Sequence, residues 1–148
     1  EAHPWIDYHV SLTGNGRTRV ADAVSRLRSE GVRTSLFIDP DPSAVRAAVE
    51  IGADAIELHT GEYANSEKPS ARRDAEQRLA ATAELAAGLG LAVHAGHGLT
   101  YENVAPVAAI GPVEELNIGH SIVSRAVLTG LESAVRQMKE IVLRARDS

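Results

Sequence analysis

The sequence contains no cysteine, which excludes disulfide bonds, a thiol nucleophile and a cysteine-ligated zinc site. Aromatic residues are also scarce, at 3% of the chain, with a single tryptophan and a single phenylalanine. The apolar content comes mainly from alanine, valine and leucine, and such a composition favours helices packed on a buried parallel sheet over an all-β sandwich. We therefore expect an α/β protein. A cysteine-free, acidic chain also fits a cytoplasmic location.

Several sequence patterns that identify whole classes of protein are missing. No apolar run approaches the ~20 residues of a membrane span, and no signal peptide is recognisable, so we expect no membrane association. The dinucleotide pattern GxGxxG, the P-loop pattern GxxxxGK[ST] and the zinc pattern HExxH are absent. The net charge of -5 argues against nucleic acid as the main partner. We expect neither a cofactor nor a metal ion.

What the sequence does contain is a repeated unit of apolar strand, polar loop, helix and glycine. We predict parallel strands at the ranges 32–38, 54–59, 91–95 and 115–118, each followed by helical sequence. Four such βα units are half of a (β/α)8 barrel, and a small doubly wound sheet is the alternative. No linker divides the chain, so residues 1–148 are expected to form one partial barrel domain.

Polar residues cluster where the predicted strands end. Four of the six histidines lie at or near such ends, together with two acidic residues: Asp39, Glu57, His59, His94, His97 and His120. The carboxyl ends of parallel strands face one side of the sheet, where ligands bind in both candidate architectures. The sequence therefore predicts a site at this side.

The segment HAGHG at 94–98 and the glycine–histidine pair Gly119-His120 suggest how such a site binds an anion. Glycine lets backbone N–H groups approach a phosphate closely, and a helix that begins near His120 directs the positive end of its dipole at the same place. His97, between two glycines, is expected to be exposed, where it can donate a proton near neutral pH. The alternatives are a solvated loop histidine at 97 and a helix-capping histidine at 120.

Glu57 lies between Ile56 and Leu58, so strand alternation places it on the opposite face from both, together with His59. A catalytic role and a structural pairing with His59 are both open. A shared metal ion is disfavoured because the spacing of His94 and His97 across a strand end suits common ligation poorly. The polar segment 61–70 is either a mobile lid or an ordinary loop.

Four segments closely resemble the pyridoxine 5'-phosphate synthase family of vitamin B6 biosynthesis: SLFIDPD (35–41), AIELHTGEYA (55–64), AGHGLTYENV (95–104) and ELNIGHSIVSRAVLTGL (115–131). The resemblance runs from about residue 12 to the carboxyl terminus and implies strands five to eight of a (β/α)8 barrel. It also implies condensation of 1-deoxy-D-xylulose 5-phosphate with 3-amino-2-oxopropyl phosphate, a transferase reaction that yields pyridoxine 5'-phosphate, phosphate and water.

The same resemblance assigns roles to individual residues. His97 corresponds to the family's proton donor, whereas Gly98, Gly119 and His120 correspond to contacts with the amino-oxopropyl phosphate. Glu57 resembles a glutamate that lines the active site. The resemblance further implies phosphorylated small-molecule substrates and a homo-oligomer.

The first half of the family pattern has no counterpart here. Its Asn-x-Asp-His segment, its phosphate-binding arginines and its proton acceptors are absent, and residues 1–11 are atypical of what precedes the fifth strand. We therefore expect an open sheet edge, an exposed apolar surface and a chain that is incomplete for catalysis by itself. The alternatives are a non-catalytic phosphate-binding or assembly fragment, and another phosphosugar-handling βα-barrel lyase or synthase.

Overall fold

A single parallel sheet organises the computed structural model, which describes residues 6–9 and 14–147. Its five strands are β1 (Ile6–His9), β2 (Thr34–Ile38), β3 (Ala55–His59), β4 (Ala92–Gly96) and β5 (Val113–Asn117). They lie side by side in chain order, and every neighbouring pair is parallel. Because the strands follow one another in chain order, right-handed crossovers place all connecting helices on one face of the sheet, as in a (β/α)8 barrel. In a doubly wound sheet the strand order reverses part-way, and helices cover both faces. The fold is a partial barrel, and the doubly wound alternative is wrong.

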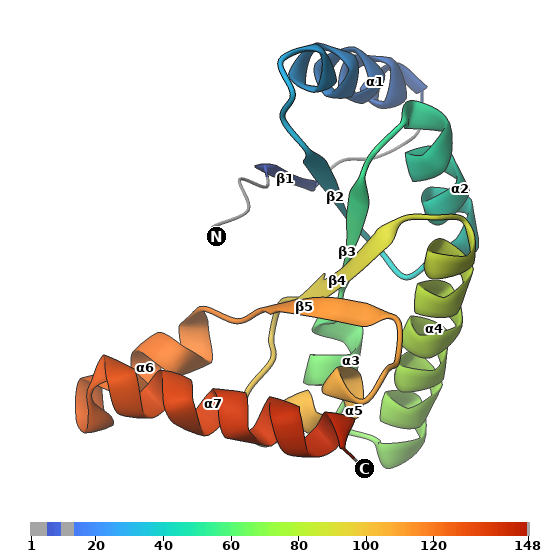
Figure 1. Ribbon diagram of the computed structural model, residues 1–148. Helices are drawn as coiled ribbons and strands as arrows, with labels where there is room; N and C mark the ends of the chain where they lie inside the picture. Colours follow the sequence, from blue (N-terminus) through green and yellow to red (C-terminus); the bar gives the residue numbers. More distant parts are fainter. Residues whose placement is uncertain (1–5, 10–13, 148) are drawn as a thin grey trace.

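Most helices lie on the outside of the curved sheet, whereas the last two, within residues 120–146, extend past the last strand (Figure 1). The helices are α1 (Gly14–Ser29), α2 (Pro42–Ile51), α3 (Gly61–Asn65), α4 (Pro69–Gly88), α5 (Val104–Ala108), α6 (His120–Thr129) and α7 (Leu131–Arg146). Among the described residues, none of these helices is long and apolar enough to span a bilayer.

The four predicted strands are confirmed, with ends that differ from the prediction by one or two residues. Two features were not predicted. Residues 6–9 of the atypical amino-terminal segment form β1, which adds to the edge of β2 with Ile6 opposite Thr34. The segment 61–70 is mostly helical, because α3 begins at Gly61 with Tyr63 buried and α4 begins at Pro69. The segment is therefore more ordered than a plain loop, and whether it moves as a lid stays a prediction.

Local sequence explains where helices begin and end, as α2 illustrates. The Asp41 carboxylate accepts hydrogen bonds from the backbone amides of Ser43 and Ala44, which caps the first turn. The hydrogen bond from the Ser43 hydroxyl holds the pKa of Asp41 below its usual value. The helix ends at Gly52, whose φ of 85° lies in the left-handed region that glycine adopts readily.

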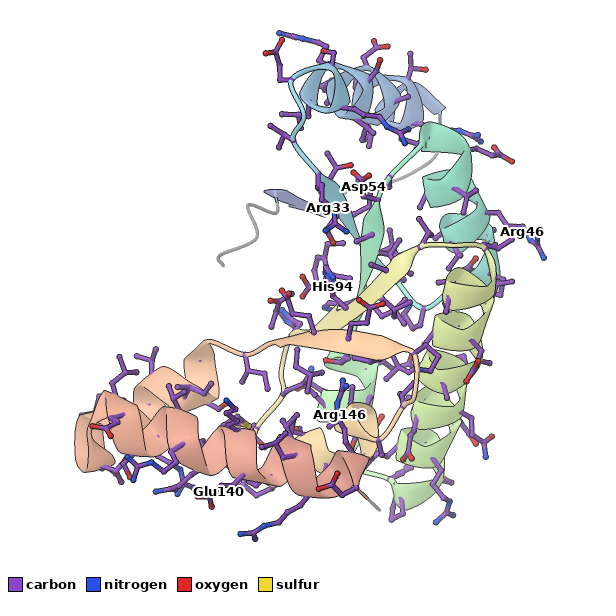
Figure 2. All side chains as sticks on the ribbon, in the orientation of Figure 1. Arg33, Arg46, Asp54, His94, Glu140 and Arg146 are labelled. Atoms are coloured by element: carbon purple, nitrogen blue, oxygen red, sulfur yellow. The ribbon has the colours of Figure 1, made fainter. Side chains whose placement is uncertain are left out.

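The two faces of the sheet differ in chemistry. On the helix side, Ile56, Leu58 and Val93 are fully buried against the helices, and each such side chain contributes about 1.5–3 kcal/mol through burial. The concave side carries polar residues, including Glu57 and its register partner His94. Figure 2 shows His94 on this concave side, whereas Arg46 points outward from α2. The sheet thus offers a polar inner surface that ends in loops.

Candidate active site

A pocket of about 710 Å³ lies at the carboxyl ends of β3, β4 and β5. The five residues to which the family resemblance assigns roles all line it: Glu57, His97, Gly98, Gly119 and His120. The remaining lining residues are Phe37, Leu99, Thr100, Asn117, Ile118 and Ser121. The strands and loops therefore bring together five candidate residues that are up to 63 positions apart in the chain.

Glu57 is the acidic group of the pocket and is only 6% exposed. Its Oε2 accepts a hydrogen bond of 2.8 Å from the Asn117 side-chain amide on β5. A Cβ atom at Gly96 would collide with the Glu57 carboxylate and would approach the Asn117 carbonyl oxygen to 3.0 Å. The glycine at 96 therefore leaves the space in which the carboxylate sits. Asn117, which precedes the Gly119-His120 pair, was not predicted to contribute.

His97 is exposed, as predicted, but its backbone was not expected to be unusual. Its φ of 83° makes it the one non-glycine residue with positive φ among the described residues. A non-glycine residue in this region costs about 1–3 kcal/mol, and such strain clusters at functional sites. The imidazole lies beside His59, with ring centroids 4.6 Å apart, and near Phe37 at 6.3 Å. The ring therefore lies at the pocket wall in contact with His59, while the residue stays exposed.

Hydrogen bonds made by Asn103, which is itself held by Tyr63 of the neighbouring βα unit, stabilise the turn that carries His97. The Asn103 side chain donates to the Gly98 carbonyl oxygen at 3.2 Å and accepts from the Thr100 amide at 2.7 Å. Tyr63 of α3 is buried, and its hydroxyl donates to the Asn103 carbonyl oxygen at 2.8 Å. Burial raises the pKa of the Tyr63 phenol, and Glu76 raises it further, so the phenol stays a neutral donor. Neither Tyr63 nor Asn103 was predicted to support the site.

The loop after β5 ends at Gly119, where α6 begins. Its φ of -104° is available to any residue, and a Cβ atom there would meet nothing within 4 Å. The Ser121 hydroxyl donates to the Leu99 carbonyl oxygen at 2.9 Å, which ties this loop to the one after β4. The first turn of α6 leaves backbone amides without helical acceptors, and the dipole of the helix makes that end attractive to anions. His120 is exposed beside it.

His59 and His94 lie outside the pocket lining. His59 Nδ1 is 3.7 Å from Oδ1 of Asp39, the residue that follows β2. His94 is 3% exposed, with Nδ1 3.5 Å from the Ser35 hydroxyl. Within the described ranges, no three histidine or acidic side chains gather in a way that would hold a metal ion.

The pocket lining contains no lysine or arginine.

Comparison with known proteins decides the family. The family model of the pyridoxal phosphate biosynthesis protein PdxJ matches residues 12–144. The chain belongs to this family. The match begins after β1, so the strand that was not predicted lies outside the family pattern.

Curated relatives agree with this assignment. The pyridoxine 5'-phosphate synthase of Geobacter metallireducens is 45% identical over 137 residues, which cover 93% of this chain and 55% of that protein. That of Magnetococcus marinus is 49% identical over 136 residues, covering 92% and 56%. The PdxJ-family chain described here therefore spans about half the length of the curated relatives it matches.

Solved structures of lower identity share the fold. The Amycolatopsis orientalis BexX/CysO complex contains a chain that aligns with a TM-score of 0.62 and 20% identity, covering 95% of this chain and 55% of that one. Mandelate oxidase with benzoyl-formic acid aligns with a TM-score of 0.57 and 18% identity, covering 86% and 37%. At this identity the likeness shows the fold alone. In both cases this chain matches only part of a longer chain.

Proposed function

We propose that this chain supplies one half of the active site of a pyridoxine 5'-phosphate synthase. The reaction condenses 1-deoxy-D-xylulose 5-phosphate with 3-amino-2-oxopropyl phosphate and yields pyridoxine 5'-phosphate, phosphate and water. One observation carries the proposal: the five candidate residues come from three different βα units and line one pocket. Membership of the PdxJ family supports the same reaction.

The phosphate of the amino ketone binds between the two loops. Backbone amides near Gly98 and in the first turn of α6 supply donors, and His120 adds an imidazole at the same end of the helix. Because the lining has no lysine or arginine, the described half holds the anion with dipoles and hydrogen bonds alone. We expect weak binding by this chain, and tighter binding once cationic groups are added from elsewhere.

His97 acts as the general acid that protonates a departing oxygen. It is exposed to the pocket, and the strained turn fixes its ring at the wall beside His59. General acid catalysis contributes typically ~10²–10⁴-fold to a rate. The Glu57 carboxylate, held by Asn117, faces the same pocket and attracts the ammonium group of the amino ketone.

The test compares the chain alone with a completed barrel. In the completed protein, the part of the Geobacter metallireducens relative that this chain does not cover is fused ahead of residue 12. We expect pyridoxine 5'-phosphate and free phosphate to form with the fusion and not with the 148-residue chain. A matched fusion that carries His97→Asn separates turnover from mere assembly. Phosphate binding without turnover in the unmodified fusion would support the non-catalytic fragment instead.

We also propose that the chain self-associates. Side chains on α6 and α7 leave a strongly exposed apolar surface, which consists of Val123, Val127, Leu128, Leu131 and Val135. β5 pairs with β4 and with no other described strand, so its second edge is open as well. Exposed patches of this kind mark interaction surfaces. Sedimentation should show oligomers that dissociate when Val127 and Leu128 are both replaced by glutamate, and a wild-type monomer would contradict the proposal.

A further inference from the structure

Thr60 occupies an unusual position between β3 and α3. It is fully buried and precedes the first residue of α3, where a threonine hydroxyl normally accepts a hydrogen bond from an amide of the helix. No such capping bond is present. The hydroxyl instead lies 2.7 Å from the Gly96 carbonyl oxygen and 2.5 Å from the His97 carbonyl oxygen. A group that would ordinarily stabilise its own helix is directed at the adjacent catalytic loop.

The backbone of Thr60 reinforces this contact, because its amide donates to the Gly96 carbonyl oxygen at 2.8 Å. The single hydroxyl proton is therefore shared between two carbonyls, one of which already has a donor. The Gly96 carbonyl oxygen also accepts from the Thr60 amide, so the hydroxyl matters most to the His97 carbonyl oxygen. His97 is the residue whose φ of 83° needs support from its surroundings, since other conformations are less strained.

The residues on either side of Thr60 serve the same loop. The His59 ring packs against the His97 ring, with centroids 4.6 Å apart. Gly61 makes room for the His59 ring, because a Cβ atom there would lie 2.6 Å from His59 Cε1. All three residues of the segment 59–61 therefore help to place His97. His59 contacts its ring, Thr60 donates a hydrogen bond to its carbonyl oxygen, and Gly61 leaves space for the His59 ring.

We propose that Thr60 is a positioning residue whose hydroxyl holds His97 in the left-handed conformation that keeps its imidazole at the pocket wall beside His59. What His97 then does rests on the proposed function, whereas the clamp itself does not. Without the hydroxyl, the His97 carbonyl oxygen loses its Thr60 donor in a part-buried setting. The turn then relaxes toward ordinary backbone angles, and the imidazole leaves His59.

Three variants of the 148-residue chain test this proposal. Thr60→Val removes the hydroxyl at nearly constant shape, Thr60→Ser keeps it, and Thr82→Val removes another buried threonine hydroxyl on α4, away from the pocket. The first measurement is the NMR cross-relaxation between ring protons of His59 and His97. We expect it in the wild type, Thr60→Ser and Thr82→Val, and expect its loss in Thr60→Val. An unchanged contact in Thr60→Val would overturn the proposal.

The second measurement is a titration with inorganic phosphate, followed through the His97 and Gly98 signals. We expect affinity about tenfold lower in Thr60→Val and recovery in Thr60→Ser. If the wild type shows no phosphate response, the proposed function fails, while the ring contact still decides the role of Thr60.

Unfolding of Thr60→Val would not end the test, because the wild type allows a direct measurement. A clamped hydroxyl predicts a slowly exchanging Thr60 hydroxyl proton with cross-relaxation to the backbone of residues 96–98. A hydroxyl proton in fast exchange with water would overturn the proposal.

Discussion

At the end of β4 and in the loop after it, the surroundings require glycine at two positions, whereas in the loop after β5 they leave glycine optional. Gly96 lies against the Glu57 carboxylate, and Gly98 combines a φ of 76° with a Cβ position 2.8 Å from the Ala64 Cβ. Gly119 has an ordinary φ and open space around it. The first loop is a braced scaffold for His97 and Glu57. The second presents an uncovered backbone that a ligand can approach, so substitution should affect folding in one loop and binding in the other.

The largest effect is expected from His97→Asn in the fused, completed barrel. Asparagine tolerates a left-handed backbone, so stability should change by no more than about 0.5 kcal/mol. Loss of the proposed general acid should lower kcat by about 10²–10⁴-fold, with a much smaller change in KM. Steady-state kinetics and thermal melting measure the two quantities.

His94→Asn is the control for that experiment. His94 is buried away from the pocket lining, so its substitution should affect folding more than turnover by the folded protein. Turnover that is lost with the His94 variant and kept with the His97 variant would show that the proton donor is assigned to the wrong histidine.

Gly96→Ala should be the most disruptive glycine substitution. The added methyl group meets the Glu57 carboxylate and the Asn117 backbone, and such overpacking costs typically about 1–3 kcal/mol. Urea unfolding of the 148-residue chain measures the loss. Gly88→Ala is the matched control, because a Cβ atom at that helical position meets nothing within 4 Å and alanine favours a helix. Equal stability of the two variants would remove the steric argument for Gly96.

Gly119→Val should weaken phosphate binding while changing stability little, the opposite of Gly96→Ala. The side chain projects into open space at the start of α6, so stability should fall by less than about 1 kcal/mol. Affinity for inorganic phosphate should fall about tenfold, which corresponds to about 1.4 kcal/mol, because the side chain obstructs the approach to the helix amides. Gly119→Ser, which keeps a small capping residue, should bind nearly as well. Unchanged affinity in the valine variant would mean that Gly119 serves only the chain turn.

The smallest effect is expected from Ser121→Ala, which removes a hydrogen bond that joins the two loops. The half-buried hydroxyl donates to the Leu99 carbonyl oxygen, and a bond of this kind contributes about 0.5–1.5 kcal/mol. Chemical denaturation should detect this loss. Ser124→Ala on the exposed side of α6 should change stability less. If Ser124→Ala is as destabilising as Ser121→Ala, the link between the loops contributes nothing measurable.

Much of the architecture was predictable because its signals are local. Apolar alternation located β3, including the face on which Glu57 lies, and helix caps such as Asp41 follow from a few neighbouring residues. β1 was missed because four residues at a sheet edge become a strand only through pairing with β2. The helix α3 was missed because its polar sequence resembles a loop, and burial of Tyr63 stabilises it.

The support of the site was not predictable in the same way. The hydrogen bonds from Asn117 to Glu57 and from Thr60 to His97 join residues that are 60 and 37 positions apart. No short pattern marks Thr60 as a clamp, since an N-terminal threonine before a helix ordinarily indicates a cap. Only the register of β3, β4 and β5 brings these groups within hydrogen-bonding distance.

The sequence by itself determined the βα repeat, the polar strand ends and the chemical groups available to the site, because side-chain alternation and helix termination depend on residues close in the chain. Tertiary structure decided what each group does. It placed the Glu57 carboxylate over Gly96, held His97 at positive φ and left Gly119 uncovered. These properties depend on how neighbouring loops meet, and that is set by strand register and packing rather than by local preference.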